Sequence, residues 1–301
     1  MKRVVLSLFL SSAALAATPP VPPAATLPSA PLAQAQPGSE VALPEPLRFP
    51  HPLGDAFLFR PAACPPACPL VVVSHSRGMT SEVSLTRPHL RSLYARLLGA
   101  GYAVLVSNDA GATTWGAPQT LTYLADMRSR AIRTFPFNGR TYNFGYSMGG
   151  LPALLTAFYP VYPVSGVVLL DAEVNLRDVW QGSNATFRSD IAAAHGVSQG
   201  TPLPPRRDPF NDFNTPQAAQ VPLLVAGSPE DQVVPFARHG EAIFARTTSP
   251  ESRLVRLTGP HLGGSHFGDA LVNEMLAFLN RLEQRVTPDQ GALPGPSGEV
   301  N

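Results

Sequence analysis

The chain has 301 residues, of which 44% are hydrophobic and 14% are charged, so it carries enough apolar material for one large core. Its formal net charge at pH 7 is only +1, which gives no electrostatic reason to expect a nucleic acid or an anionic membrane as partner. These properties favour a globular protein that acts on a neutral or small-molecule substrate.

The first residues are typical of a secretory signal peptide. Two cations precede a short apolar run, and Ala14-Leu15-Ala16 has the small-x-small pattern that signal peptidase cleaves. The apolar run, residues 4–17, is shorter than the ~20 residues that a membrane-spanning helix needs, so we expect no stable membrane anchor. The sequence therefore predicts a signal peptide at 1–16, cleavage near Ala16, and a secreted or periplasmic location.

Composition divides the rest of the chain into three parts. Residues 17–40 are rich in alanine and proline with little to bury, and they are expected to form an extended linker. Residues 287–301, rich in proline and glycine, are expected to form a disordered tail. The folded body should lie between, at about 41–286, as a single domain.

Strand and helix patterns alternate within this body. Seven short β-branched or apolar runs predict strands: Ala56–Arg60, Leu70–Ser74, Ala103–Ser107, Thr141–Phe144, Val167–Asp171, Leu223–Ala226 and Arg253–Leu257. Apolar residues at helical spacing between them predict helices near 90–98, 121–132 and 271–282. The alternation predicts an α/β fold with a mainly parallel sheet covered on both faces. It lapses at about 172–220, where turn-forming residues predict a cap-like insertion.

The sequence contains two cysteines, Cys64 and Cys68, four positions apart. In an exported protein we expect them to form a local disulfide, which would contribute roughly 2 kcal/mol by closing a short loop. Two free thiols, or half of a metal site, are the alternatives.

Gly145-Tyr146-Ser147-Met148-Gly149 matches the G-x-S-x-G motif of a nucleophile held on a sharp strand-to-helix turn. The glycines let strand and helix approach closely, while the turn exposes the serine hydroxyl at the helix N-terminus. Apolar residues precede the motif and a helical pattern follows it, as this arrangement requires. Ser147 is therefore the candidate nucleophile; the alternative is a glycine-rich turn with an incidental serine.

A serine nucleophile needs an imidazole to accept its proton. His266, in a glycine-bounded loop between the last predicted strand and the last helix, is the predicted base, and His261 is its competitor five residues earlier. His51, His195 and His239 are expected to be surface or ordinary polar residues.

The imidazole in turn needs a carboxylate that orients it. Asp231, in the turn directly after the strand ending near Ala226, is the predicted acid. Asp171, at the end of the preceding strand, is the main alternative; Glu230 is expected to point elsewhere and Asp109 is more distant.

Two backbone N–H groups are expected to stabilise the oxyanion of an acyl-transfer intermediate. Met148 follows the nucleophile, and Arg77 lies in the loop after the strand ending at Ser74. His75, Trp115 and Tyr146 are candidate substrate-pocket residues, with packing beneath the cap as the alternative for the tryptophan.

Together these segments resemble the α/β-hydrolase superfamily, in particular exported dienelactone-hydrolase-like, lipase-like and platelet-activating-factor-acetylhydrolase-like serine esterases. The resemblance rests on PLVVVSHSRG (69–78), GYAVLVSND (101–109), GYSMGG (145–150), GSPEDQVVP (227–235) and GGSHFG (263–268), which occur in the family's order. Two positions depart from it. Relatives usually have glycine where this chain has Ser76, and dienelactone hydrolases proper use cysteine where this chain has Ser147.

The resemblance implies an α/β-hydrolase fold and a serine hydrolase that cleaves carboxylic esters through an acyl-enzyme, with a small-molecule ester substrate and no cofactor or metal. A peptidase or amidase of the prolyl-oligopeptidase kind and a non-catalytic binding protein on the same scaffold are the alternatives. The sequence leaves the acyl chain length and the oligomeric state open.

Overall fold

The computed structural model describes residues 25–26, 42–64, 66–159, 161–213 and 215–285. The predicted signal peptide, most of the predicted linker and the predicted tail lie outside these residues. Within the linker, Ala25–Thr26 forms the short strand β1, which pairs with a strand near the C-terminus of the body.

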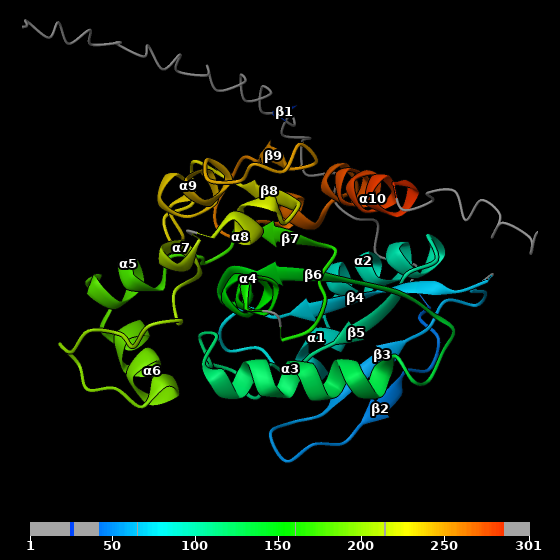
Figure 1. The fold of residues 1–301 in the computed structure, drawn as a ribbon, viewed down its shortest axis with the longest axis horizontal. Helices are drawn as coiled ribbons and strands as arrows, with labels where there is room; N and C mark the ends of the chain where they lie inside the picture. Colours follow the sequence, from blue (N-terminus) through cyan, green and yellow to red (C-terminus); the bar gives the residue numbers. More distant parts are fainter. Residues whose placement is uncertain (1–24, 27–41, 65, 160, 214, 286–301) are drawn as a thin grey trace, which may run out of the picture.

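Nine strands of the described chain form one sheet in the order β1-β9-β8-β7-β6-β4-β5-β3-β2 (Figure 1). Their bounds are β2 Leu47–Phe49, β3 Ala56–Phe59, β4 Cys68–Ser74, β5 Ala103–Val106, β6 Phe137–Tyr146, β7 Gly166–Leu170, β8 Leu223–Gly227 and β9 Arg253–Arg256, besides β1. Only β2 and β3 pair antiparallel to their neighbours. All seven predicted strands are found, and the predicted mainly parallel sheet is confirmed.

From β4 onward the helices of the described chain alternate with the strands, and four helices occupy the segment between β7 and β8. The α-helices are α1 Ser81–Leu85, α2 Pro88–Gly99, α3 Pro118–Ala131, α4 Gly150–Phe158, α5 Leu176–Gln181, α6 Ala185–His195, α7 Pro209–Asp212, α8 Pro216–Gln220, α9 Gly240–Phe244 and α10 Asp269–Gln284, and three short 3-10 helices are η1 Ser147–Gly149, η2 Phe236–Arg238 and η3 Gly264–Phe267. Helices α5 to α8 fill the segment between β7 and β8, and α5 and α6 lie beside one end of the sheet, at the left of Figure 1.

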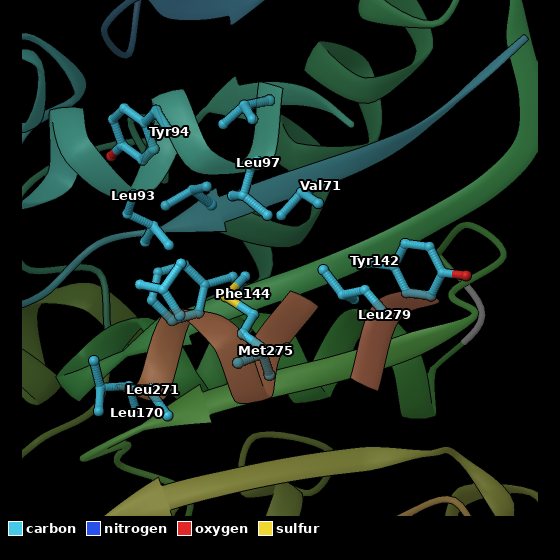
Figure 2. Close-up of a cluster of buried hydrophobic side chains, with 14 of the residues drawn as sticks. Val71, Leu93, Tyr94, Leu97, Tyr142, Phe144, Leu170, Leu271, Met275 and Leu279 are labelled. Carbon is cyan, nitrogen blue, oxygen red and sulfur yellow. The ribbon is translucent and has the colours of Figure 1, made fainter. Parts of the chain in front are cut away.

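Side-chain alternation along the central strands covers both faces of the sheet. Val71 and Val73 of β4 point to a cluster formed with α2 and α10 (Figure 2), while Leu70 and Val72 point to a cluster formed with α3. Since both faces of β4 are buried, its sequence is a continuous apolar run rather than an alternating one. This rigid sheet carries the loops described below at the carboxyl ends of its parallel strands.

The cysteine prediction is confirmed by a disulfide between Cys64 and Cys68. Cys68 is the first residue of β4, so the bridge ties the preceding loop to the start of a central strand. Among the described residues, no helix combines the length and hydropathy needed to cross a membrane.

Candidate active site

Ser147 lies on a sharp turn between β6 and α4. Its φ is +52°, in the left-handed region that a residue with a side chain rarely adopts. The strand ends at Tyr146, η1 makes the turn and α4 begins at Gly150. The strained backbone and the strand-to-helix setting are those that the sequence motif predicts for a nucleophile.

Both flanking glycines are required by close backbone contacts. A Cβ on Gly145 would lie 2.3 Å from the carbonyl oxygen of Gly149, and a Cβ on Gly149 would lie 2.3 Å from that of Ser74. The first contact closes the turn on itself, and the second packs the turn against the end of β4. The two glycines therefore permit the approach of strand and helix that the motif implies.

Gly145→Ala is expected to destabilise the fold by about 1–3 kcal/mol, because the added methyl group meets backbone atoms that cannot move independently. Denaturant unfolding monitored by circular dichroism measures this loss. Gly99→Ala is the matched control, because a Cβ at the end of α2 meets nothing within 4 Å. Equal unfolding midpoints for the two variants would contradict the packing argument.

A histidine and an aspartate complete a hydrogen-bonded chain with the serine. The Nε2 atom of His261 lies 2.9 Å from Oγ of Ser147, and its Nδ1 atom lies 2.6 Å from Oδ2 of Asp231. The serine is 8% exposed and the His261 side chain 15% exposed, so a small ligand can reach them from one side. The geometry is that of a nucleophile, a general base and an orienting acid.

The turn after β8 fixes the carboxylate of Asp231. Its Oδ1 atom accepts hydrogen bonds from the N–H groups of Val233 and Val234 at 2.8 and 2.9 Å, while Oδ2 is left to His261. Burial alone would raise the pKa of Asp231, but the hydrogen bonds from His261 and from the two N–H groups outweigh it, so the pKa lies below its ordinary value of 3.8. Asp231 is thus held as an anion beside the imidazole.

The prediction that His266 is the base is wrong. The 3-10 helix η3 turns this side chain into the interior, where it is fully buried and its Nδ1 atom lies 2.6 Å from Oδ2 of Asp171. Asp171, the alternative acid, therefore pairs with His266 and not with the histidine that contacts the serine. One sequence signal favoured His261: it sits in the turn TGPHLGG five residues after the end of β9, before the next helical turn begins.

The predicted oxyanion donors lie on two adjacent loops. Met148 is the second residue of η1, so its N–H has no partner within that helix. The loop after β4 is held by Asp109, whose Oδ2 accepts from the N–H of His75 at 2.9 Å. Two residues further on, the Arg77 side chain pairs with Asp190 of α6 at 2.6 Å and lies over the Phe187 ring. Among the described residues, nothing accepts a hydrogen bond from the N–H of Arg77.

The three candidate pocket residues are packing residues. Trp115 and Tyr146 are 1% and 2% exposed, and each lies inside an apolar cluster. His75 is also buried, with Nδ1 and Nε2 at 2.8 and 3.1 Å from the carbonyl oxygens of Ser76 and Asn108. The substrate-pocket prediction is therefore corrected for these residues, and the packing alternative holds for Trp115.

Sequence reasoning missed a buried acid beside Ser147. Glu173 follows Asp171 in the loop after β7, and its N–H donates to the carbonyl oxygen of Ser147 at 2.9 Å. Its carboxyl group faces His239, with Oε2 3.3 Å from Nδ1. Burial, and then the charges of nearby Asp178 and Asp231, raise the pKa of Glu173 well above its ordinary value.

His239, expected to be a surface or ordinary polar residue, is likewise buried, and burial lowers its pKa to about 4. The Val174 N–H points to its Nδ1 atom, and Nε2 lies 3.5 Å from Asp178. A cavity of about 410 Å³ opens against these groups, and it is lined by Glu173, Asp178, Val179, Gly182, Ser183, Asn184, Phe187, Gln232, Val233, Pro235, Arg238 and His239. No sequence pattern predicted this cavity, because its walls come from two stretches of the chain, 173–187 and 232–239, that are distant in sequence.

Comparison with solved structures finds enzymes of similar architecture. Est1E from Butyrivibrio proteoclasticus matches with a TM-score of 0.61 and 16% identity over 80% of this chain and 100% of its own. FphF, a fluorophosphonate-binding serine hydrolase of Staphylococcus aureus, matches with a TM-score of 0.61 and 15% identity over 78% of this chain and 97% of its own. The acylaminoacyl peptidase of Pyrococcus horikoshii matches with a TM-score of 0.60 and 14% identity over 80% of this chain but 42% of its own.

No protein-family model and no curated protein sequence matches the chain. At these identities the structural matches establish the architecture only. The order of the strands, the serine on the turn after β6 and the matching structures agree on one architecture. The chain has the α/β-hydrolase fold.

Proposed function

We propose that the protein is a serine-dependent hydrolase that cleaves carboxylic esters through an acyl-enzyme. The observation that carries the proposal is the hydrogen-bonded chain from Ser147 through His261 to Asp231. A serine hydroxyl on a strained turn, a base within 3 Å and a buried acid behind the base are the parts that nucleophilic acyl transfer requires. FphF, which has the same architecture, carries the name serine hydrolase, and this favours the same chemistry here.

The steps follow from the geometry. Oγ of Ser147 attacks the ester carbonyl carbon while Nε2 of His261 takes the hydroxyl proton. The carbonyl oxygen becomes an anion that the N–H groups of Met148 and Arg77 stabilise. The C–O bond to the alcohol then breaks, and His261 returns the proton to the leaving alkoxide. Water, deprotonated by the same imidazole, attacks the acyl-enzyme and releases the carboxylic acid.

The match to an acylaminoacyl peptidase keeps an amide-cleaving function as the second candidate. The chain corresponds to less than half of that protein, so the match concerns only part of it. Turnover of an aminoacyl p-nitroanilide compared with that of a p-nitrophenyl ester distinguishes the two reactions. We expect the ester to be the better substrate.

Export is proposed with the function. The N-terminal sequence pattern and the disulfide between Cys64 and Cys68 both favour an oxidising compartment outside the cytoplasm. Expression of the full-length chain should release the protein into the periplasm or the medium. N-terminal sequencing of the released protein should show cleavage near Ala16.

Ser147→Ala is expected to lower kcat for a short p-nitrophenyl ester by about 10³-fold or more, because no other hydroxyl replaces the nucleophile. A fluorophosphonate probe should label the wild type and not the variant. Ser265→Ala, which removes an exposed hydroxyl from η3, is the control and should retain activity and labelling. Undiminished ester turnover by Ser147→Ala would end the proposal.

A further inference from the structure

We propose that Asp171 and His266 form a second, buried carboxylate–imidazolium pair that positions the loop carrying His261 and balances charge beside it. The inference rests on the proposed hydrolase function and assigns a role to two residues that the triad does not use. Both act through His261, so they are positioning residues and take no part in the bond changes.

The hydrogen bonds of His266 require the charged form of its ring. Nδ1 lies 2.6 Å from the Asp171 carboxylate, and Nε2 lies 2.9 Å from the carbonyl oxygen of Thr258. Both partners can only accept, so both ring nitrogens must carry a proton. The side chains of His266 and Asp171 are fully buried, so the cation and the anion offset each other's loss of hydration. Burial disfavours the cation, yet the hydrogen bond and charge of Asp171 outweigh it and raise the pKa of His266 above 6.5.

The pair holds the loop on both sides of the base. Oδ2 of Asp171 also accepts from the N–H of Leu262, directly after His261, at 2.8 Å. On the other side His266 holds Thr258, and Glu230 accepts from the N–H of Gly259 at 3.0 Å. Positive φ angles at Asp171 (+43°) and Leu262 (+51°) show that neither backbone is in a relaxed conformation. The loop is therefore fixed from three points while His261 contacts Ser147.

The pair also lies close enough to affect the charge of the triad. One polar atom each of Asp171, Asp231 and His261 lie within 4.8 Å of one another. Oδ1 of Asp171 is buried and has no hydrogen-bond partner among the described residues. Without His266, the loop would place a second buried carboxylate beside the base with no cation to balance it. Such a carboxylate would favour the protonated, inactive form of the imidazole.

Other ionisable groups lie on the elements near the pair, and the three pair variants leave them unchanged. Those groups are Asp231 and Glu230 in the turn after β8, Glu173 after β7, His261 in the same loop, and His89 of α2, whose ring packs on Phe267.

The test compares His266→Ala, His266→Asn and Asp171→Asn by the pH dependence of kcat/KM for a p-nitrophenyl ester. We expect His266→Ala to lower kcat/KM by about 10- to 100-fold, and His266→Asn, which can still donate to Asp171, to lower it less. Both should move the acid limb of the profile to higher pH by about half a pH unit or more, because Asp171 is left unbalanced. Asp171→Asn should move it to lower pH. A loss of packing alone would not give shifts of opposite sign.

Proton NMR of the full-length protein tests the pair without substrate. Two far-downfield imidazole N–H signals are expected, since His261 and His266 each donate Nδ1–H to a carboxylate at 2.6 Å. Each His266 variant should lose one signal, and Ser147→Ala should keep the signal of the pair. This measurement therefore does not depend on the proposed function. If the proposed function itself is wrong, the wild-type protein will show no ester hydrolysis.

His89→Asn is the matched control, because it removes an exposed imidazole from the other side of Phe267. Its activity, pH profile and spectrum should be those of the wild type. Wild-type pH profiles for all three pair variants, or a single downfield signal in the wild type, would overturn the inference. If Asp171→Asn does not fold, the pH profiles of the two His266 variants and the proton NMR spectrum still test the inference.

Discussion

His261→Gln is expected to lower kcat for ester hydrolysis by about 10³- to 10⁴-fold, because glutamine cannot take the proton from Ser147 or return it to the leaving group. The loss should appear in kcat rather than in KM, since the imidazole acts in the transition state of proton transfer and does not contribute to binding of the substrate in the ground state. Steady-state kinetics with a p-nitrophenyl ester measures both constants. Fluorophosphonate labelling of Ser147 should slow in parallel.

The comparison with His266→Ala distinguishes the two candidate bases. That variant retains the chain from Ser147 to Asp231 and is expected to keep at least about a hundredth of the activity. His51→Gln, near the opposite edge of the sheet after β2, controls for the loss of an imidazole as such. A fully active His261→Gln together with an inactive His266→Ala would restore the sequence-based assignment and refute the structural one.

Glu173→Gln is expected to raise the free energy of unfolding at neutral pH. The pKa of this buried carboxyl lies well above its ordinary value of 4.5, so the folded protein keeps a proton that the unfolded chain releases. Stability in the wild type therefore falls as pH rises above 4.5, by about 1.4 kcal/mol per pH unit, until the folded pKa is reached. Glutamine is neutral at every pH and close in shape to the protonated carboxyl group, so the variant lacks this pH-dependent loss of stability.

Urea unfolding of both proteins between about pH 5 and about pH 8 measures the effect. The advantage of Glu173→Gln should be smallest at the acid end and increase with pH. Glu45→Gln, at an exposed glutamate before β2, should show no such trend. A stability difference that does not change with pH would mean that Glu173 is ionised in the folded protein.

Much of the fold could be predicted because its signals are local. The runs around Val71, Val104 and Val168 are apolar on both faces, and such runs between helical patterns indicate buried parallel strands. The strand Leu47–Phe49 was missed because an edge strand of three residues has too short a pattern.

The site was predicted in part for a related reason. Ser147 directly follows β6 and Asp231 lies in the turn after β8, so the sheet itself brings them to one edge. The choice between His261 and His266 depends on which way a loop of eleven residues, 258–268, folds back. That choice is decided by contacts with Asp171 and Glu230, which are 87 and 28 residues before Thr258 and leave no trace in the local pattern.

The ion pair between Arg77 and Asp190 has a consequence for protein engineering. It joins the segment between β7 and β8 to the loop that carries Arg77, the proposed oxyanion donor, and Phe187 lies under the same guanidinium. Grafting a different segment at 176–208 to change substrate preference would also remove the anchor of that loop. A grafted segment should therefore keep Asp190 and Phe187, so that Arg77 retains both contacts. Without them we expect a slower catalyst, whatever substrate the new segment admits.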